Sequence, residues 1–283
     1  MQIFRTRWLT VAALLIATPQ AFAQDAATQF TRISPSEEGR PAALQTAIVT
    51  YASRGDPERL SVDLVAAVHL GDKSYYAELN SRFTAYDALL YELVAPSGSV
   101  VSERASNSPG ILSTAQAMLA NFLDLSFQLD EIDYGAANFV HADLSPQELR
   151  QSMAERNESL YVYFWRLYFA AMKDYSRDPY GVNDLATMMA SGVGYDLKTL
   201  FAFELASMSM SGDILAGDSG SALIGDRNQR ALDVLRQQID SRSRRVGIFY
   251  GAAHLPDLEQ RLLRDFGLIH ERTVWIDAWR LSD

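Results

Sequence analysis

The fold is decided by residues 244–264, which read RRVGIFYGAAHLPDLEQRLLR. The run at 246–250 is short, apolar and rich in β-branched and aromatic residues, which predicts a buried strand. Small residues and then His254 follow it, and small residues at the carboxyl end of a strand allow a tight turn that projects an imidazole beyond the sheet. A proline and an aspartate then open a helix over 258–266, with the proline in the first turn, where it is tolerated.

A second copy of this pattern lies nearer the N-terminus, at residues 64–72, which read LVAAVHLGD. It ends in His69 and leads into a helix that we expect over about 73–82. Both copies place His-Leu-x-Asp after small residues and before a helix. This similarity predicts one strand, turn and helix unit used twice, which brings His69 and His254 to one site.

A third apolar run, at 88–94, contains Glu92. Strand, helix and strand in this order form the right-handed crossover unit of a parallel sheet, whose strands end at a common edge. We therefore expect Glu92 and His69 to converge there. A buried carboxylate costs several kcal/mol unless it is paired or metal-bound. The alternatives are that Glu92 faces solvent on an edge strand or pairs with a structural arginine.

The remaining segments predict a single α/β domain over 41–283 with a mainly parallel sheet. Strands at 47–51 and 60–65, separated by a turn, form a hairpin. Residues 273–279 alternate apolar and polar side chains, which predicts an antiparallel closing strand at the edge. Between the two halves of the sheet, about 105–222 reads as a large helical insertion.

Two features stand out within the predicted insertion. Residues 145–148 form a capping box with proline in the first turn of a helix. Residues 160–172 carry six aromatic side chains on a helix that is apolar nearly all round, which favours core packing over a role in lining a substrate groove.

The N-terminus predicts export. Residues 1–23 contain two arginines, an apolar run and a small-x-small cleavage site, which together indicate a signal peptide and a periplasmic location. The apolar run is shorter than the roughly 20 residues that a membrane anchor requires, so no stable membrane insertion is expected. Residues 24–40 have no periodicity and predict a flexible lead-in.

The chain of 283 residues has no cysteine, which excludes disulfides and thiolate chemistry. Without the two arginines of the signal peptide, 23 basic residues face 35 acidic ones, a net charge of −12. A surface of this charge repels phosphate backbones, so nucleic acid is not an expected partner.

Four motifs together resemble the TraB/Tiki superfamily. They are the small pair before His69, the strand with Glu92, the triplet DRN at 226–228 and GAAHLP at 251–256. The superfamily includes bacterial GumN-like proteins and, more remotely, erythromycin esterases and ChaN-like haem-binding proteins. The resemblance implies their α/β core, and the Tiki branch implies metal-dependent proteolysis with manganese or cobalt. Members of the family carry two Gly-x-x-His motifs, and in the first of them Ala66 stands where the family usually has glycine.

The chemistry of the residues agrees with that resemblance. Two imidazoles and one carboxylate are a sufficient set for a divalent ion, such as Mn, Co or Zn, that activates water. His69 and His254 are the candidate ligands, and Glu92 is a third ligand or the general base. Arg227 would stabilise negative charge on a carbonyl oxygen, and Asp226 would orient a histidine or Arg227. The expected substrate is a peptide or a small acyl compound. In a metal-free alternative, histidine is the base and Glu92 orients it.

Other readings stay open. The chain could be a non-catalytic haem- or metal-binding protein of the ChaN-like kind, or a degenerate scaffold. His141 and His270 are expected to be structural. Asp72 and Asp257 either support the imidazoles or cap helices. The sequence has no Gly-x-Ser-x-Gly elbow, phosphate-binding loop, dinucleotide fingerprint or His-Glu-x-x-His pair. Common serine hydrolases, nucleotide enzymes and thermolysin-like peptidases are therefore not supported.

Overall fold

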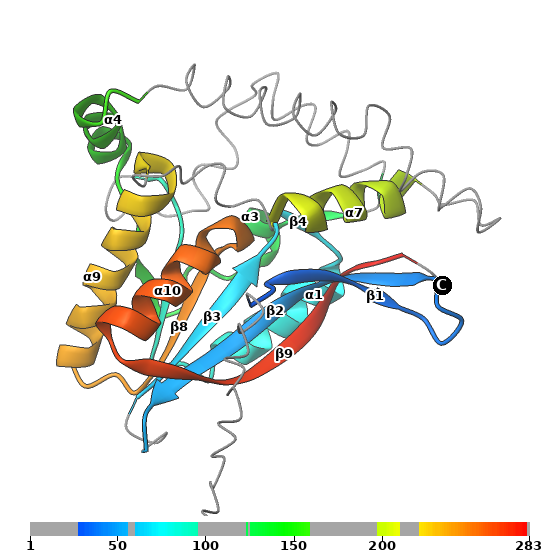
Figure 1. Ribbon diagram of the computed structural model, residues 1–283, viewed down its shortest axis with the longest axis horizontal. Helices are drawn as coiled ribbons and strands as arrows, with labels where there is room; N and C mark the ends of the chain where they lie inside the picture. Colours follow the sequence, from blue (N-terminus) through cyan, green and yellow to red (C-terminus); the bar gives the residue numbers. More distant parts are fainter. Residues whose placement is uncertain are drawn as a thin grey trace, which may run out of the picture.

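The computed structural model (Figure 1) describes residues 28–55, 60–95, 123, 125–158, 197–209 and 221–281. The strands are β1 (Thr31–Pro35), β2 (Pro41–Ser53), β3 (Ser61–Ala67), β4 (Leu70–Gly71), β5 (Ala88–Tyr91), β6 (Ser126–Phe127), β7 (Phe139–His141), β8 (Arg245–Gly251) and β9 (Leu268–Arg280). The α-helices are α1 (Lys73–Phe83), α3 (Gln128–Glu131), α4 (Pro146–Glu155), α7 (Leu197–Ser209), α9 (Arg227–Asp240) and α10 (Leu255–Asp265). A π-helical turn η2 (Ala222–Asp226) precedes α9, and a 3₁₀ turn η3 (Ala252–His254) precedes α10.

The main sheet is mixed, with a parallel centre. Strand β8 pairs in parallel with β3 on one side and with β5 on the other, and β5 pairs in parallel with β7. Strand β2 is antiparallel to β3, to β1 and to β9. The predicted α/β class is confirmed. The order also makes the two histidine strands direct neighbours, because β8 lies between β3 and β5.

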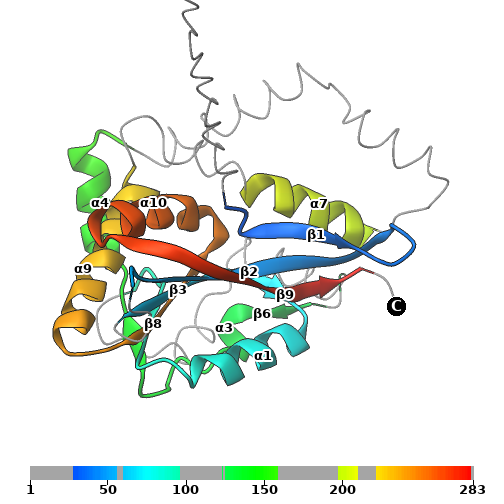
Figure 2. The same cartoon turned by 60° about the horizontal axis from the view of Figure 1, so that its bottom comes forward.

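Helices cover both faces of this sheet. Figure 2 shows α9 and α10 on one face and α1 on the other. Leu64 of β3 packs with Leu232 of α9 and Leu258 of α10, whereas its neighbour Val65 packs with Phe83 of α1. A strand that is buried on both faces needs apolar residues at successive positions, which explains the near-continuous apolar runs of β3 and β8. Each fully buried valine, leucine, isoleucine or phenylalanine in these runs stabilises the fold by about 1.5–3 kcal/mol.

Several local predictions are confirmed. Residues 47–51 and 60–65 lie in the antiparallel pair of β2 and β3, the helix at 73–82 is α1, and the closing strand at 273–279 is part of β9, antiparallel to β2. Ser145 caps α4: it accepts a hydrogen bond from the Glu148 amide, while the Glu148 carboxylate accepts one from the Ser145 amide. These elements carry their signals in their own residues, so short windows of sequence identify them.

The flexible lead-in predicted over 24–40 is wrong for its second half. Residues 31–35 form β1, which pairs with the first part of β2. Phe30, just before it, is buried in the core, and the Thr28 hydroxyl donates a hydrogen bond of 2.6 Å to Glu259 of α10. Such a short strand has no apolar periodicity of its own and is ordered by its tertiary partners.

The helical insertion predicted over 105–222 also needs correction. Strand β7 lies within this range and belongs to the main sheet, where it pairs with β5. The region therefore contributes a strand as well as helices α3, α4 and α7. The aromatic segment 160–172 and the predicted signal peptide at 1–23 lie outside the described residues. Among the helices that the structure describes, none is long and apolar enough to cross a membrane.

Candidate functional site

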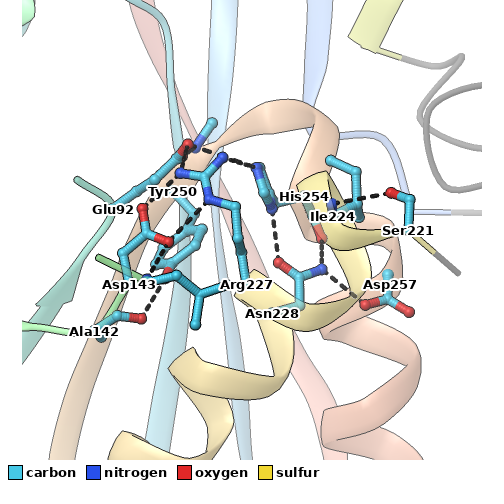
Figure 3. A network of polar contacts seen from close by, with 12 residues as sticks. Glu92, Ala142, Asp143, Ser221, Ile224, Arg227, Asn228, Tyr250, His254 and Asp257 are labelled. Atoms are coloured by element: carbon cyan, nitrogen blue, oxygen red, sulfur yellow. Dashed lines mark hydrogen bonds and ion pairs between the residues drawn. The ribbon is translucent and has the colours of Figure 1, made fainter. Parts of the chain in front are cut away.

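The candidate site lies at the carboxyl edge of the parallel strands. His69 follows β3, Glu92 follows β5, Asp143 follows β7, and His254 ends the 3₁₀ turn after β8. In an open α/β sheet this edge is where functional side chains gather, because the strands end there together. Figure 3 shows Glu92, Asp143 and His254 facing a side chain from the neighbouring helix α9, Arg227.

Arg227 is the centre of the network. Its Nε donates to Asp143 Oδ1 at 2.9 Å, and its Nη2 donates to Asp143 Oδ2 at 2.6 Å and to Glu92 Oε1 at 2.7 Å. The Asp143 side chain is fully buried, and that of Arg227 is 11% exposed. A two-point contact between guanidinium and carboxylate fixes both groups strongly. The π-helical turn η2 leads directly into Arg227, and such turns are frequent at functional sites.

Glu92 is held as a carboxylate by two contacts. Besides Arg227, the backbone amide of Gly251 donates to its Oε2 at 2.7 Å. A Cβ at Gly251 would lie 3.2 Å from this oxygen, so a larger residue would crowd the carboxylate. Burial acts to raise the pKa of Glu92, but His254, Arg227, the Gly251 amide and His69 together outweigh burial and lower the pKa to about 2. Glu92 is therefore ionised at neutral pH.

His254 is buried and contacts the network through both ring nitrogens. Its Nε2 lies 3.5 Å from Glu92 Oε1 and 3.4 Å from Arg227 Nη1, and its Nδ1 lies 2.7 Å from Asn228 Oδ1. Burial lowers the pKa of His254, and the Arg227 charge lowers it further, although Glu92 acts in the opposite direction. The imidazole is therefore neutral at neutral pH, next to an ionised carboxylate.

His69 lies at the same edge but outside this network. Its side chain is exposed, and its backbone oxygen accepts a hydrogen bond from the Gln128 amide at 3.0 Å. His69 is close enough to help lower the pKa of Glu92. Within the part of the chain that the structure describes, however, no three His, Asp or Glu side chains group into a metal site. The trio of His69, His254 and Glu92 thus shares an edge without forming a three-ligand cluster.

Asp226 does not take the role expected for it. It is the N-terminal boundary residue of α9, and its carboxylate faces α4. There it accepts hydrogen bonds from Arg156 at 2.6 and 2.7 Å and one from Ser152. Asp143, rather than Asp226, orients Arg227. Asp143 follows a strand whose carboxyl end joins this edge, and recognising that strand as part of the sheet would have found it.

The two remaining histidines have structural contacts. His141 Nε2 lies 2.6 Å from the Leu93 backbone oxygen. His270 is exposed, and its Nε2 lies 3.0 Å from the Thr273 hydroxyl. Neither contact reaches the network around Arg227, which agrees with the structural roles expected for both.

The two ambiguous aspartates differ from each other. Asp72 bonds to Lys198 at 3.2 Å and to the Arg280 amide at 2.8 Å, away from the network. Asp257 accepts a hydrogen bond of 2.7 Å from Asn228, which in turn contacts His254. Asp257 therefore belongs to the surroundings of His254, and Asp72 does not.

Comparisons with known proteins identify no relative of this chain. The chain matches no family model, no curated protein and no solved structure. The fold and the site define an α/β protein with a buried network of carboxylates, guanidinium and imidazole at the carboxyl edge of its sheet.

Proposed function

We propose that this chain is an exported hydrolase of the TraB/Tiki type that cleaves peptide or related acyl bonds in the periplasm. The observation that carries the proposal is the meeting of three groups: His254 Nε2 lies within 3.5 Å of both Glu92 Oε1 and Arg227 Nη1. A neutral imidazole, an ionised carboxylate and a fixed cation in one buried place can together catalyse acyl transfer. The order of the four motifs, which resembles that superfamily, supports the same reaction class.

The groups have distinct roles in this proposal. His254 Nε2 takes a proton from a water molecule that attacks the carbonyl carbon, and the imidazolium then gives this proton to the leaving amine or alkoxide as its bond to that carbon breaks. Glu92 stabilises the imidazolium that results, because its charged oxygen lies 3.5 Å away. Arg227 Nη1 faces the negative charge that develops on the carbonyl oxygen. Asp143 holds Arg227 in place and so avoids reorganisation during the reaction.

The sequence predicts a divalent ion, but no step of the proposed hydrolysis depends on one. Glu92 Oε1 is already bonded to Arg227, and Oε2 to the Gly251 amide. A metal bound by Glu92 and His254 would also lie beside the Arg227 cation, which disfavours a second positive charge. The residues in this arrangement therefore fit the metal-free alternative better than a site for Mn, Co or Zn.

The proposal is tested with residues 24–283 and a panel of internally quenched peptides and acyl esters. We expect hydrolysis of at least one substrate, and a loss of about a hundredfold or more in kcat for His254→Gln, which removes the base. His270→Gln, at an exposed histidine, is the matched control and should keep the wild-type rate. No hydrolysis of any substrate, or full activity of His254→Gln, would contradict the proposal.

Chelation separates the two mechanisms. The metal-free route predicts that exhaustive chelation leaves the hydrolysis rate unchanged. A loss that Mn, Co or Zn restores would instead support a metal held by His69 and His254, and His69→Ala should then lower the metal content of the purified protein.

A further inference from the structure

We propose that Asn228 is a positioning residue that holds the neutral His254 with its proton on Nδ1 and leaves Nε2 unprotonated. Asn228 is the second residue of α9 and is completely buried. The proposal rests on the proposed function only for the use made of Nε2, as the base. The position of the proton on the ring follows from the contacts alone.

The orientation of the Asn228 amide is fixed by two acceptors. Its Nδ2 donates to the His254 backbone oxygen at 3.0 Å and to Asp257 Oδ2 at 2.7 Å. A carbonyl oxygen and a carboxylate accept hydrogen bonds and donate none. Turning the amide over would therefore place its oxygen against two other oxygens. Asn228 Oδ1 must face His254 Nδ1, at 2.7 Å, and Nδ1 must carry the hydrogen.

The other ring nitrogen, Nε2, lies near both Arg227 and Glu92. Arg227 Nη1 lies 3.4 Å from His254 Nε2, and a guanidinium group only donates. A hydrogen on Nε2 would face the hydrogens of Arg227, although Glu92 Oε1, at 3.5 Å, could accept it. The contact at Nδ1 is much shorter, at 2.7 Å, so it decides the tautomer and leaves a lone pair on Nε2. The Arg227 contact agrees with this tautomer, and because it is longer than the usual 2.7–3.2 Å of a hydrogen bond, it leaves the lone pair accessible to a proton.

The amide also sets the charge of the imidazole. A carboxylate at the same place would favour the imidazolium and raise the pKa of His254. The neutral amide orients the ring without adding a charge. Asp257, the carboxylate that holds Asn228, is itself paired with Arg261 at 2.8 Å on the same helix. The positive charge of Arg261 therefore partly offsets the effect of the Asp257 charge on the imidazole.

Nitrogen-15 spectra of the histidine rings test the proposal without a substrate. The chain has four histidines, and comparison with His254→Gln assigns the signal of His254. In the wild-type protein at neutral pH, we expect Nδ1 to show the shift of a protonated nitrogen and Nε2 that of an unprotonated one. The reverse pattern, or a positively charged ring, would overturn the proposal.

Two substitutions of Asn228 have different expected effects on the His254 ring. Asn228→Leu removes the acceptor, so we expect the neutral ring to move its proton to Nε2, where Glu92 Oε1 can accept it. Asn228→Asp keeps an acceptor at Nδ1 but adds a charge, so the proton should stay on Nδ1 while the pKa of His254 rises. An unchanged tautomer in a folded Asn228→Leu protein would overturn the proposal.

The matched control is Asn138→Leu. Asn138 also donates two hydrogen bonds, to the backbone oxygens of Phe83 at 2.9 Å and Tyr86 at 3.0 Å, but none to His254. The Asn138→Leu protein should lose about as much unfolding free energy as Asn228→Leu, without any change in the His254 spectrum. If no substrate is hydrolysed while the wild-type ring carries its proton on Nδ1, the hydrolase proposal fails and the positioning role of Asn228 stands.

Discussion

Asp143 has no exposed side-chain surface and bonds to Arg227 through both of its oxygens. Removing one partner of a buried ion pair leaves an uncompensated charge, which typically costs about 3–5 kcal/mol. Because Glu92 still contacts Arg227, we expect Asp143→Ala to lower the free energy of unfolding by about 3 kcal/mol, at the lower end of that range.

Urea unfolding measures this loss, with Asp233→Ala as the control. Asp233 pairs with Arg236 on the surface of α9, and both side chains are about half exposed. Exposed pairs contribute about 0–1 kcal/mol. Equal losses for the two variants would show that the Asp143 contact is no stronger than a surface pair.

Acid should weaken the fold through Glu92. Its pKa in the folded protein is about 2, against a usual value of 4.5. A lowered carboxyl pKa stabilises the fold fully above about pH 4.5, and this contribution is lost as the pH falls towards 2. The shift corresponds to about 3 kcal/mol.

Unfolding of the wild type and of Glu92→Gln, followed between pH 7 and pH 2, measures this effect. Glutamine cannot ionise, so the difference in unfolding free energy between the two proteins should shrink below pH 4.5. A difference that stays constant down to pH 2 would mean that the Glu92 carboxyl has an ordinary pKa.

Individual residues were predictable where a motif placed them at the carboxyl edge of the sheet. His254, Glu92 and Arg227 are three of the candidates from the sequence, and they lie together, although the pairing of Glu92 with an arginine was the alternative to its expected convergence with His69. Asp143 was missed because β7 has only three residues and its apolar pattern is too short to identify a strand. Asp226 was assigned a role that depended on the direction of its side chain, which sequence spacing does not fix.

At the scale of elements, β8 shows how closely the central strands pack. Gly247 lies between β3 and β5, and a Cβ there would come within 2.5 Å of Leu89 Cδ1 and 2.9 Å of Tyr86 Cε2. Overpacking of this kind typically costs about 1–3 kcal/mol. We therefore expect Gly247→Ala to lower the unfolding free energy by about 2 kcal/mol.

Gly135→Ala is the control for this substitution. Gly135 is exposed, and the nearest atom to its Cβ would be Asp133 Oδ1 at 3.3 Å, on an exposed side chain that can move. Its urea midpoint should stay close to that of the wild type. If Gly247→Ala were equally well tolerated, β8 would not be packed as tightly as the distances of 2.5 and 2.9 Å imply.

The elements themselves were largely predictable, and their order was not. Local patterns predicted the β2–β3 hairpin, α1, α10 and β9, because each has its own apolar periodicity, turn or cap. The placement of β8 between β3 and β5 depends on contacts between segments about 160 to 180 residues apart, which no local window contains. Strand β1 was missed for a related reason: its stability comes from β2 and the core around Phe30.

At the scale of the whole molecule, the first described residues tie the N-terminal part of the chain to its C-terminal part. Phe30 is buried, and Thr28 bonds to Glu259, which also accepts a hydrogen bond of 2.7 Å from Tyr51. A chain that begins at residue 41 loses these contacts and β1. Burial of one phenylalanine alone contributes about 2–3 kcal/mol.

Thermal unfolding of chains that begin at residues 24, 28 and 41 measures this contribution. We expect the first two to unfold at similar temperatures and the third several degrees lower, because a loss of about 1 kcal/mol shifts the midpoint of a domain this large by roughly 2–4 °C. Identical midpoints for all three would restore the interpretation of 24–40 as a flexible lead-in.

The chemistry of the whole molecule depends on His254 and Glu92 acting as one unit. A double-mutant cycle of single-turnover hydrolysis rates measures this directly, using His254→Gln, Glu92→Gln and the double variant. Because Glu92 is proposed to act through the imidazolium of His254, the double variant should hydrolyse substrate no more slowly than His254→Gln alone. Two losses that multiply in the double variant would contradict a shared catalytic centre at this edge of the sheet.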